Sequence, residues 1–194
     1  MKGFTLIETL VAVTIVTVAV SGAIFSANSA MVAAQVSRDR LTASYLAQEG
    51  VEYVRAMRDD AFLQEYHAGN ANASADAWNS FTNGAPGSTP WSIRGCVDVT
   101  CTLDPLRSMG SVGNGSSLNS CGQGNGNACT PLYFANGAYT QQDNISGGVK
   151  TPFTRTIQAT AISSTEESIV SIVTWNLHGT QFTASTAAHL TPWQ

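Results

Sequence analysis

Hydrophobic and polar positions divide the chain into an apolar N-terminal stretch, an amphipathic stretch and a C-terminal region of alternating residues. Residues 4–31 form the apolar stretch, and Glu8 is the only formally charged side chain between Lys2 and Arg38. A helix over residues 4–31 would be about 42 Å long at about 1.5 Å per residue, which exceeds a bilayer core of about 30 Å. The pattern therefore predicts a membrane-spanning helix.

The same helix is predicted to continue beyond the apolar stretch. No proline interrupts residues 4–62, so the sequence favours a single helix of about 55 residues. Between residues 36 and 57, apolar side chains recur at steps of three or four, the period of one helix face. They are Ala43, Ala47, Val51, Val54 and Met57. Charged residues lie largely elsewhere, and Arg55 and Asp59 are expected to pair on the exposed side.

Two glycines are the weak points of the predicted helix. Gly22 and Gly50 each cost about 1 kcal/mol relative to alanine in a helix interior. Gly22 has three possible interpretations. It allows the span to bend, it allows a neighbouring helix to approach closely as small residues do in membranes, or it has no special role. The sequence alone does not choose among these three interpretations.

The C-terminal region alternates apolar and polar residues, which is typical of half-buried β-strands. Strands are predicted at residues 153–162, 169–174 and 181–190, joined by turns at 163–167 and 178–180. Shorter strands are expected at residues 91–94 and 97–99. Antiparallel strands with one apolar face can pack on the amphipathic half of the long helix. The predicted fold class is therefore α+β, a long helical spine packed on a C-terminal antiparallel β-sheet head.

The region between the helix and the C-terminal strands is poor in periodic patterns. Residues 70–90 are rich in Asn, Ala, Ser, Gly and Pro and indicate a loop with one short helix. The Gly, Asn and Ser tract over residues 108–127 predicts an exposed, mobile loop.

Composition bounds the class of protein. A chain of 194 residues with 43% hydrophobic residues has enough apolar side chains for one domain plus an extended element. The net charge of −4 and the 11% of charged residues argue against nucleic-acid binding, which usually needs a clustered basic face.

Four cysteines, namely Cys96, Cys101, Cys121 and Cys129, fit an oxidising location. Three pairings are possible, and proximity in sequence favours Cys96 with Cys101 and Cys121 with Cys129. A zinc site is the competing interpretation. The spacing lacks two tight C-x2-C knuckles, and no histidine lies between Cys96 and Cys129, so a metal site is not predicted.

No pattern indicates an enzyme. The three histidines, His67, His178 and His189, lie far apart and have no ligand or triad partner nearby in sequence. The chain lacks a Gly-x-Ser-x-Gly elbow and a phosphate-binding glycine loop followed by Lys-Ser/Thr. We therefore expect no catalytic residues and no cofactor.

Glu8 needs a functional explanation, because an ionised acid near the middle of a bilayer costs roughly 2.5–3.5 kcal/mol. An ordinary signal peptide with cleavage near residues 21–23 is one alternative. That interpretation is weakened by the single basic residue at the start, by Glu8 itself, and by the uncharged stretch that continues past Ala23.

The segment Gly3-Phe4-Thr5-Leu6-Ile7-Glu8 closely resembles the N-terminus of type IV pilins and of the pseudopilins of type II secretion systems. The resemblance implies that a prepilin peptidase cleaves between Gly3 and Phe4 and methylates the new amine of Phe4. It also implies an assembly role for Glu8, whose carboxylate is attracted to the Phe4 amine of the preceding subunit. The N-terminal end of a helix dipole favours the same carboxylate.

A second, shorter pattern resembles minor pilins of the modification type. It is Ala-x-Glu-Gly-x-Glu-x-x-Arg over residues 47–55, which lies ahead of the globular head in that group. The final strands, with Trp175 and residues 190–193, are also similar to those of minor pilins and pseudopilins. A calcium site of major pseudopilins depends on an acidic C-terminal loop, and none is evident near Trp193.

The resemblance implies a structural subunit, a minor pilin of a type IV pilus that joins, primes or caps the filament. A minor pseudopilin and an adhesive module at a pilus tip are the alternatives. The expected partners are prepilin peptidase, other pilin or pseudopilin subunits, a membrane assembly platform and, before assembly, the lipid bilayer. The expected location is the cytoplasmic (inner) membrane with a single span and the head outside, and then the filament.

This interpretation divides the chain into five segments. They are a leader peptide (1–3), a transmembrane and filament-core helix (4–35), the amphipathic half of the spine (36–62), an irregular region with two disulfide loops (63–130), and the β-sheet of the head (131–194).

Overall fold

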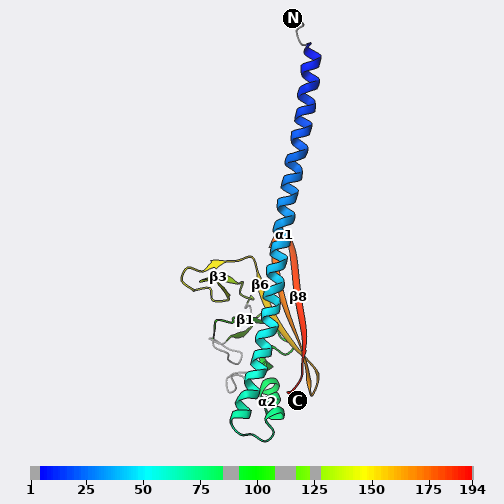
Figure 1. Ribbon diagram of the computed structural model, residues 1–194. Coiled ribbons are helices and arrows are strands. Elements are labelled where there is room, and N and C mark those ends of the chain that lie inside the picture. The colour runs from blue at the N-terminus through cyan, green and yellow to red at the C-terminus, as the bar shows by residue number, and fades with distance from the viewer. Residues whose placement is uncertain (1–4, 85–91, 108–116, 123–127, 194) are drawn as a thin grey trace. The chain divides into compact units, whose positions relative to one another are not determined.

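The computed structural model describes residues 5–84, 92–107, 117–122 and 128–193. The chain divides into two compact units, Met1–Leu41 and Thr42–Gln194. Helix α1 (Leu6–His67) contributes to both units (Figure 1). It has 62 residues, more than the predicted 55 or so, and it is the helix that is long and apolar enough to span a membrane by length and composition.

Helix α1 ends where a glycine can adopt a left-handed backbone. Gly69 has a φ of 73°, and its amide donates to the carbonyl of Tyr66 over 3.0 Å. Left-handed glycines commonly close helices because they lack a Cβ. The helix therefore continues past residue 62, where the amphipathic half was expected to end.

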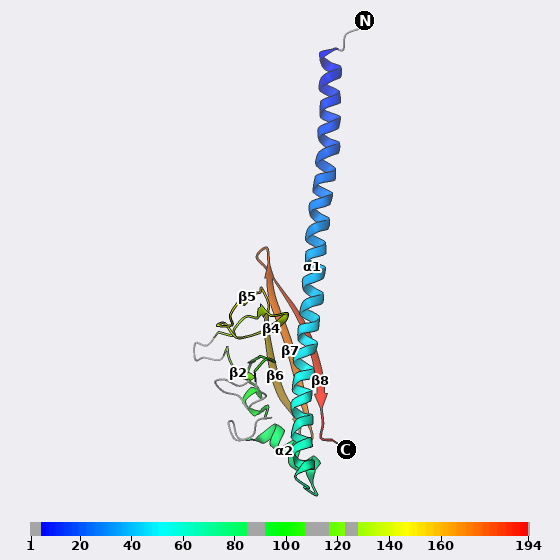
Figure 2. The same cartoon turned by 60° about the vertical axis from the view of Figure 1, so that its left-hand side comes forward.

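The second unit combines the last part of α1 with two antiparallel sheets (Figure 2). The five-stranded sheet has the strand order β2-β1-β6-β7-β8, and the three-stranded sheet has the order β4-β3-β5. The further elements are α2 (Ala73–Asn83), η1 (Arg94–Cys96), β1 (Cys101–Leu103), β2 (Leu118–Ser120), β3 (Tyr133–Ala135), β4 (Ala138–Thr140), β5 (Val149–Lys150), β6 (Thr154–Ser163), β7 (Glu166–Leu177) and β8 (Thr180–Leu190).

The alternation of the C-terminal strands is the reason for their packing. Every second residue of β7 from Glu167 to Trp175 is buried, and β6 buries Arg155, Ile157 and Ala159 in the same way. The two strands pair antiparallel, as do β7 and β8. The predicted α+β fold with three long C-terminal strands is confirmed.

The predicted apolar face of α1 forms the centre of the core. Its five residues, Ala43, Ala47, Val51, Val54 and Met57, are at most 3% exposed. Val54 and Met57 belong to a cluster with residues of the sheet and of α2, and Ala43 and Ala47 belong to a second cluster with Val173 and Trp175. Complete burial of one large apolar side chain contributes about 1.5–3 kcal/mol.

Gly50 allows α1 to approach the sheet closely. A Cβ at this position would lie 2.8 Å from Cδ1 of Ile157 and 3.1 Å from Cβ of Ser171. By contrast, nothing lies within 4 Å of a Cβ added at Gly22. One of the two expected weak points is thus a packing requirement of the helix on β6 and β7.

Replacing Gly50 by valine is expected to lower the free energy of unfolding of the second unit by about 2–3 kcal/mol, because overpacking displaces Ile157 and Ser171. Denaturant titration of the full chain in detergent micelles, followed by near-ultraviolet circular dichroism, measures this change. Gly22→Val is the matched control and should leave the transition unchanged. Equal midpoints for the two variants would refute a close contact at Gly50.

Three local predictions were wrong. Residues 94–96 form a 3-10 turn and Val97 makes only an isolated bridge with Ala159, because Asp98 adopts a φ of 54° and interrupts any strand there. Trp91 lies outside the described residues. Arg55 pairs with Glu52 and not with Asp59, which pairs with the adjacent Arg58. Glu52 is the nearer carboxylate to Arg55, and Arg58 is the nearer guanidinium to Asp59.

The region after α1 contains the short helix that was predicted within residues 70–90, because α2 is amphipathic and buries Trp78 and Phe81. The third wrong prediction is the exposed loop over residues 108–127. Leu118 is fully buried in β2, because this short strand pairs with β1. Much of the remaining tract over residues 108–127 lies outside the described residues.

Candidate functional site

The N-terminal segment places Glu8 in the first turn of α1. The carbonyl of Thr5 accepts hydrogen bonds from the amides of Glu8 and Thr9 over 3.0 and 3.3 Å. Negative charge is favoured in the first turn, because the unpaired amides there carry partial positive charge. The predicted processing residues, Gly3 and Phe4, lie outside the described residues, immediately before this turn.

The surroundings of Glu8 are apolar and exposed. Leu6 and Ile7 are 83% and 72% exposed, and Leu10 and Val11 are also exposed. Within the described ranges the Glu8 carboxylate has neither a hydrogen-bond nor an ion-pair partner. An apolar surface of this kind requires lipid or other helices around it, so the lone carboxylate would enter the same environment.

Hydroxyl groups in this segment are already satisfied within the helix. The side chains of Thr9, Thr14, Thr17 and Ser21 each donate to a backbone carbonyl three or four residues earlier, at 2.6–2.9 Å. Such bonds remove the need for water at these positions. The helix can therefore enter an apolar phase with these hydroxyls satisfied, which leaves the Glu8 carboxylate as the polar side chain that still needs a partner among those described.

The fold and this N-terminal segment fit a membrane-anchored class of protein, with an apolar helix that bears one early acid and continues into an α+β head. The prokaryotic N-terminal methylation motif matches residues 1–24. The match supports a type IV pilin-like protein, a precursor of the pilin or pseudopilin kind. The motif implies processing by a prepilin peptidase and assembly with other pilin subunits. Comparison with curated proteins and with solved structures gave no match.

An ion pair between a buried arginine and a half-exposed glutamate fixes the second part of α1 to the sheet. Arg155 is fully buried in β6, and its Nη1 contacts a carboxylate oxygen of Glu49 and the carbonyl of Leu46. Its Nη2 donates to the carbonyl of Leu103 in β1 over 2.9 Å. Burial lowers the pKa of Arg155, and the Glu49 carboxylate opposes that change. The guanidinium thereby joins three elements of the head.

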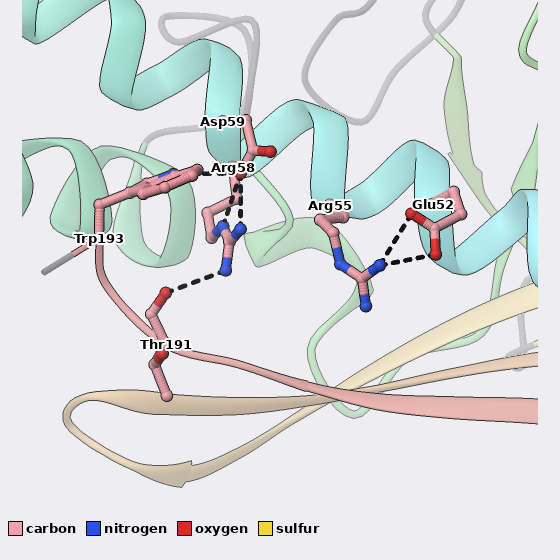
Figure 3. Close-up of polar contacts among 6 residues, drawn as sticks. All are labelled: Glu52, Arg55, Arg58, Asp59, Thr191 and Trp193. Atoms are coloured by element: carbon pink, nitrogen blue, oxygen red, sulfur yellow. Dashed lines mark hydrogen bonds and ion pairs between the residues drawn. The ribbon is translucent and has the colours of Figure 1, made fainter.

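This ion pair gives a physical reason for the pattern over residues 47–55. Ala47 is buried, Glu49 binds Arg155, and Gly50 contacts the sheet. Glu52 and Arg55 form an exposed ion pair of 2.6 Å (Figure 3). Sequence reasoning missed Arg155. The available signal was a charged residue in phase with Phe153, Ile157 and Ala159, at the buried positions of an alternating strand.

The C-terminal tail is held against α1 by a small cluster around Arg58 (Figure 3). Arg58 donates to Asp59 over 2.7 Å and to the carbonyl of Thr191 over 3.3 Å. Trp193 donates its indole N–H to Asp59 over 3.1 Å, and its ring lies 5.2 Å from the Arg58 guanidinium carbon. The segment after β8 is therefore part of the packed head.

The four cysteines form two disulfides, Cys96–Cys101 and Cys121–Cys129. These are the pairs that proximity in sequence favours. Cys96 and Cys101 are fully buried in the core cluster. No free thiol is left, so these cysteines are not zinc ligands in this form of the chain.

The histidines are not brought together. His67 ends α1, His178 lies in the turn before β8, and His189 on β8 lies 2.7 Å from a carboxylate oxygen of Glu166. Across the described ranges, no group of three or more His, Cys, Asp or Glu side chains could hold a metal ion.

Glu167 is a buried acid of β7, whereas the sequence pattern predicted that it lies in the turn at residues 163–167. It is 2% exposed, and its Oε1 has no hydrogen-bond partner in the part of the chain that the structure describes. Burial, and to a lesser extent the negative charge of Asp98, raises its pKa above the ordinary 4.5. The cause is register: Glu167 is in phase with the buried residues of β7, and Glu166 is not.

Glu167→Gln is expected to stabilise the folded chain near neutral pH. Because the folded-state pKa is raised, ionisation above pH 4.5 disfavours the folded state, and this cost is absent below that pH. The gain in the free energy of unfolding should therefore shrink as the pH falls toward 4.5 and be absent below it. Denaturant titrations of the unaltered and the Glu167→Gln chains, near neutral pH and below pH 4.5, measure this difference in the free energy of unfolding. A gain that does not depend on pH would contradict a buried, ionising Glu167.

Proposed function

We propose that the chain is a minor pilin of a type IV pilus or a related filament. In this proposal, prepilin peptidase cleaves after Gly3, the apolar part of α1 inserts in the membrane, and the same helix carries the subunit into the filament. The supporting observation is the single carboxylate of Glu8, held in the first turn of a helix whose surrounding side chains are apolar and exposed.

The partner of Glu8 in the proposed filament is the Phe4 amine of a neighbouring subunit. Cleavage after Gly3 would create this cation at the start of a second, identical kind of helix. Opposite charges attract far more strongly in an apolar environment than in water. One pairing per subunit would therefore help to set the axial register of the filament.

The minor role is supported by the residues that connect α1 to the head. The Ala-x-Glu-Gly-x-Glu-x-x-Arg pattern, which resembles that of minor pilins, coincides with the contacts of α1 on the sheet. A minor subunit that primes or caps a filament needs this helix and a head of its own shape. A minor pseudopilin of a type II secretion system uses the same helix, and an adhesive tip module would add a ligand site to the head.

The proposed topology places the head outside the cytoplasm. Two disulfides in the head fit an oxidising compartment. The subunit would await assembly in the cytoplasmic (inner) membrane as a single-pass protein, in contact with the lipid bilayer and with the membrane assembly platform.

Quantitative mass spectrometry of sheared surface filaments tests the minor-pilin role. We expect peptides of this chain in the filament fraction at a small molar ratio to the most abundant subunit, and fewer filaments when its gene is deleted. Normal piliation together with retention of secreted proteins would favour the pseudopilin instead. A chain that is itself the most abundant subunit would contradict a minor role.

A further inference from the structure

The head contains a cavity of about 410 Å³ at the end of the β6–β7 hairpin. Its walls come from α2, from the segment at η1 and from the hairpin itself, and Trp78, Asn83, Arg94, Ala161 and Glu167 are among the lining residues. Trp78 joins two of these walls, because its indole Nε1 donates to the carbonyl of Ser164 over 2.9 Å. The size lies within the range of about 300–1,000 Å³ that small-ligand sites occupy.

Two side chains of opposite charge line this cavity. The acceptor is Glu167, which is 2% exposed and whose Oε1 lacks a hydrogen-bond partner within the described ranges. The cation is the exposed Arg94, whose Nη1 donates to the carbonyl of Asn83 over 3.0 Å. A guanidinium has five N–H groups, so one anchoring bond leaves capacity for a ligand.

The charge balance narrows the class of ligand. A cation attracted by Glu167 would meet the like charge of Arg94, and an anion attracted by Arg94 would meet Glu167. Burial of a single uncompensated charge is costly. A neutral group that both donates and accepts hydrogen bonds satisfies both side chains without this cost.

The apolar wall indicates the shape of that ligand. Trp78 is 7% exposed, and its only N–H is committed to Ser164. The exposed part of the indole therefore presents carbon atoms to the cavity, whose lining also includes Val97 and Ala161. Such a surface suits the C–H face of a saturated ring, while the polar side chains suit hydroxyl groups.

We propose that this cavity binds a neutral, hydroxyl-rich ring, a single sugar residue or the end of an oligosaccharide. A ligand hydroxyl donates to the buried Glu167 carboxyl, another accepts from Arg94, and the ring packs on Trp78. This inference goes beyond the proposed function, because processing and assembly through α1 require none of these residues.

Saturation-transfer NMR on the full chain in lipid nanodiscs tests the proposal without a sugar-based detergent. The probes are the methyl glycosides of glucose, galactose, mannose and N-acetylglucosamine, with N-acetyl-lysine methylamide and N-acetyl-glutamate methylamide as charged comparisons. We expect ring C–H signals from at least one glycoside above the empty-nanodisc blank, and none from the charged probes. Binding of a charged probe alone, or of no glycoside, would overturn the proposal.

Three variants connect the signal to the cavity. Glu167→Gln should raise the Kd of the bound glycoside about tenfold or more, because it loses a hydrogen bond to a charged group. Ala161→Phe should remove binding by filling the cavity. Glu166→Gln changes the neighbouring acid, which pairs with His189 outside the cavity, and should leave the Kd unchanged.

Near-ultraviolet circular dichroism verifies that each variant is folded. If Glu167→Gln does not fold, Ala161→Phe decides the question. Glycoside binding that survives both substitutions in folded chains would place the ligand elsewhere and refute this site.

Discussion

Chains carrying Glu8→Ala are expected to insert in the membrane and to be almost absent from filaments. The substitution removes a carboxylate from an apolar surface, so insertion becomes easier. In the filament it would leave the Phe4 amine of a neighbouring subunit unpaired. Breaking one partner of a buried ion pair costs roughly 3–5 kcal/mol, and each 1.4 kcal/mol or so is a factor of ten. Incorporation should therefore fall by about a hundredfold or more.

The measurement is the ratio of chain in sheared filaments to chain in membranes, by quantitative immunoblotting. Glu8→Gln keeps the shape of the side chain and removes its charge. If the charge drives assembly, this variant should be incorporated into filaments almost as poorly as Glu8→Ala. Glu52→Ala removes an exposed acid from the second unit's part of the same helix and is the matched control. Normal incorporation of the Glu8→Ala chain would refute an assembly role for the carboxylate.

Arg155→Ala is expected to destabilise the head by about 2–5 kcal/mol, the range for removing a large buried side chain together with its hydrogen bonds. The change removes the guanidinium that donates to the carbonyls of Leu46 and Leu103, and it opens a cavity between α1 and the sheet. Glu49→Gln leaves the fully buried Arg155 guanidinium without its negative partner. It should cost about 2–4 kcal/mol, somewhat less than for a fully buried pair because the Glu49 side chain is 46% exposed. Denaturant titration of the full chain, with the double variant to measure the coupling, checks both values.

Arg55→Ala is the control for loss of an arginine. Its pair with Glu52 lies one turn apart on the exposed surface of α1, and such pairs contribute only about 0.2–0.5 kcal/mol. A midpoint for Arg155→Ala equal to that of Arg55→Ala would show that the buried guanidinium does not stabilise the head.

Local periodicity made the main elements predictable. The buried face of α1 was correct at Ala43, Ala47, Val51, Val54 and Met57 because a step of three or four residues keeps side chains on one side of a helix. The long strands β6, β7 and β8 were predicted correctly because alternation of apolar and polar residues specifies one buried face of a strand. The close spacing within each cysteine pair also limited the choice of partners.

Contacts between distant residues could not be predicted in this way. Glu49 and Arg155 are 106 positions apart, and no local pattern states which carboxylate meets a buried arginine. Glu167 follows another acid, so the pair looks like a solvated turn until the register of β7 is known. The role of Gly50 depends on Ile157 and Ser171, which only the packed sheet brings beneath the helix.

The most direct test of the central claim is mass spectrometry of the mature N-terminus. Membranes from cells with an active prepilin peptidase should contain a chain that begins at Phe4 with a methylated amine, and inactivation of the peptidase should leave the chain beginning at Met1. A mature chain that begins near residues 21–23 would show cleavage as an ordinary signal peptide. It would contradict the account of α1 and Glu8 as the assembly element of a pilin-like subunit.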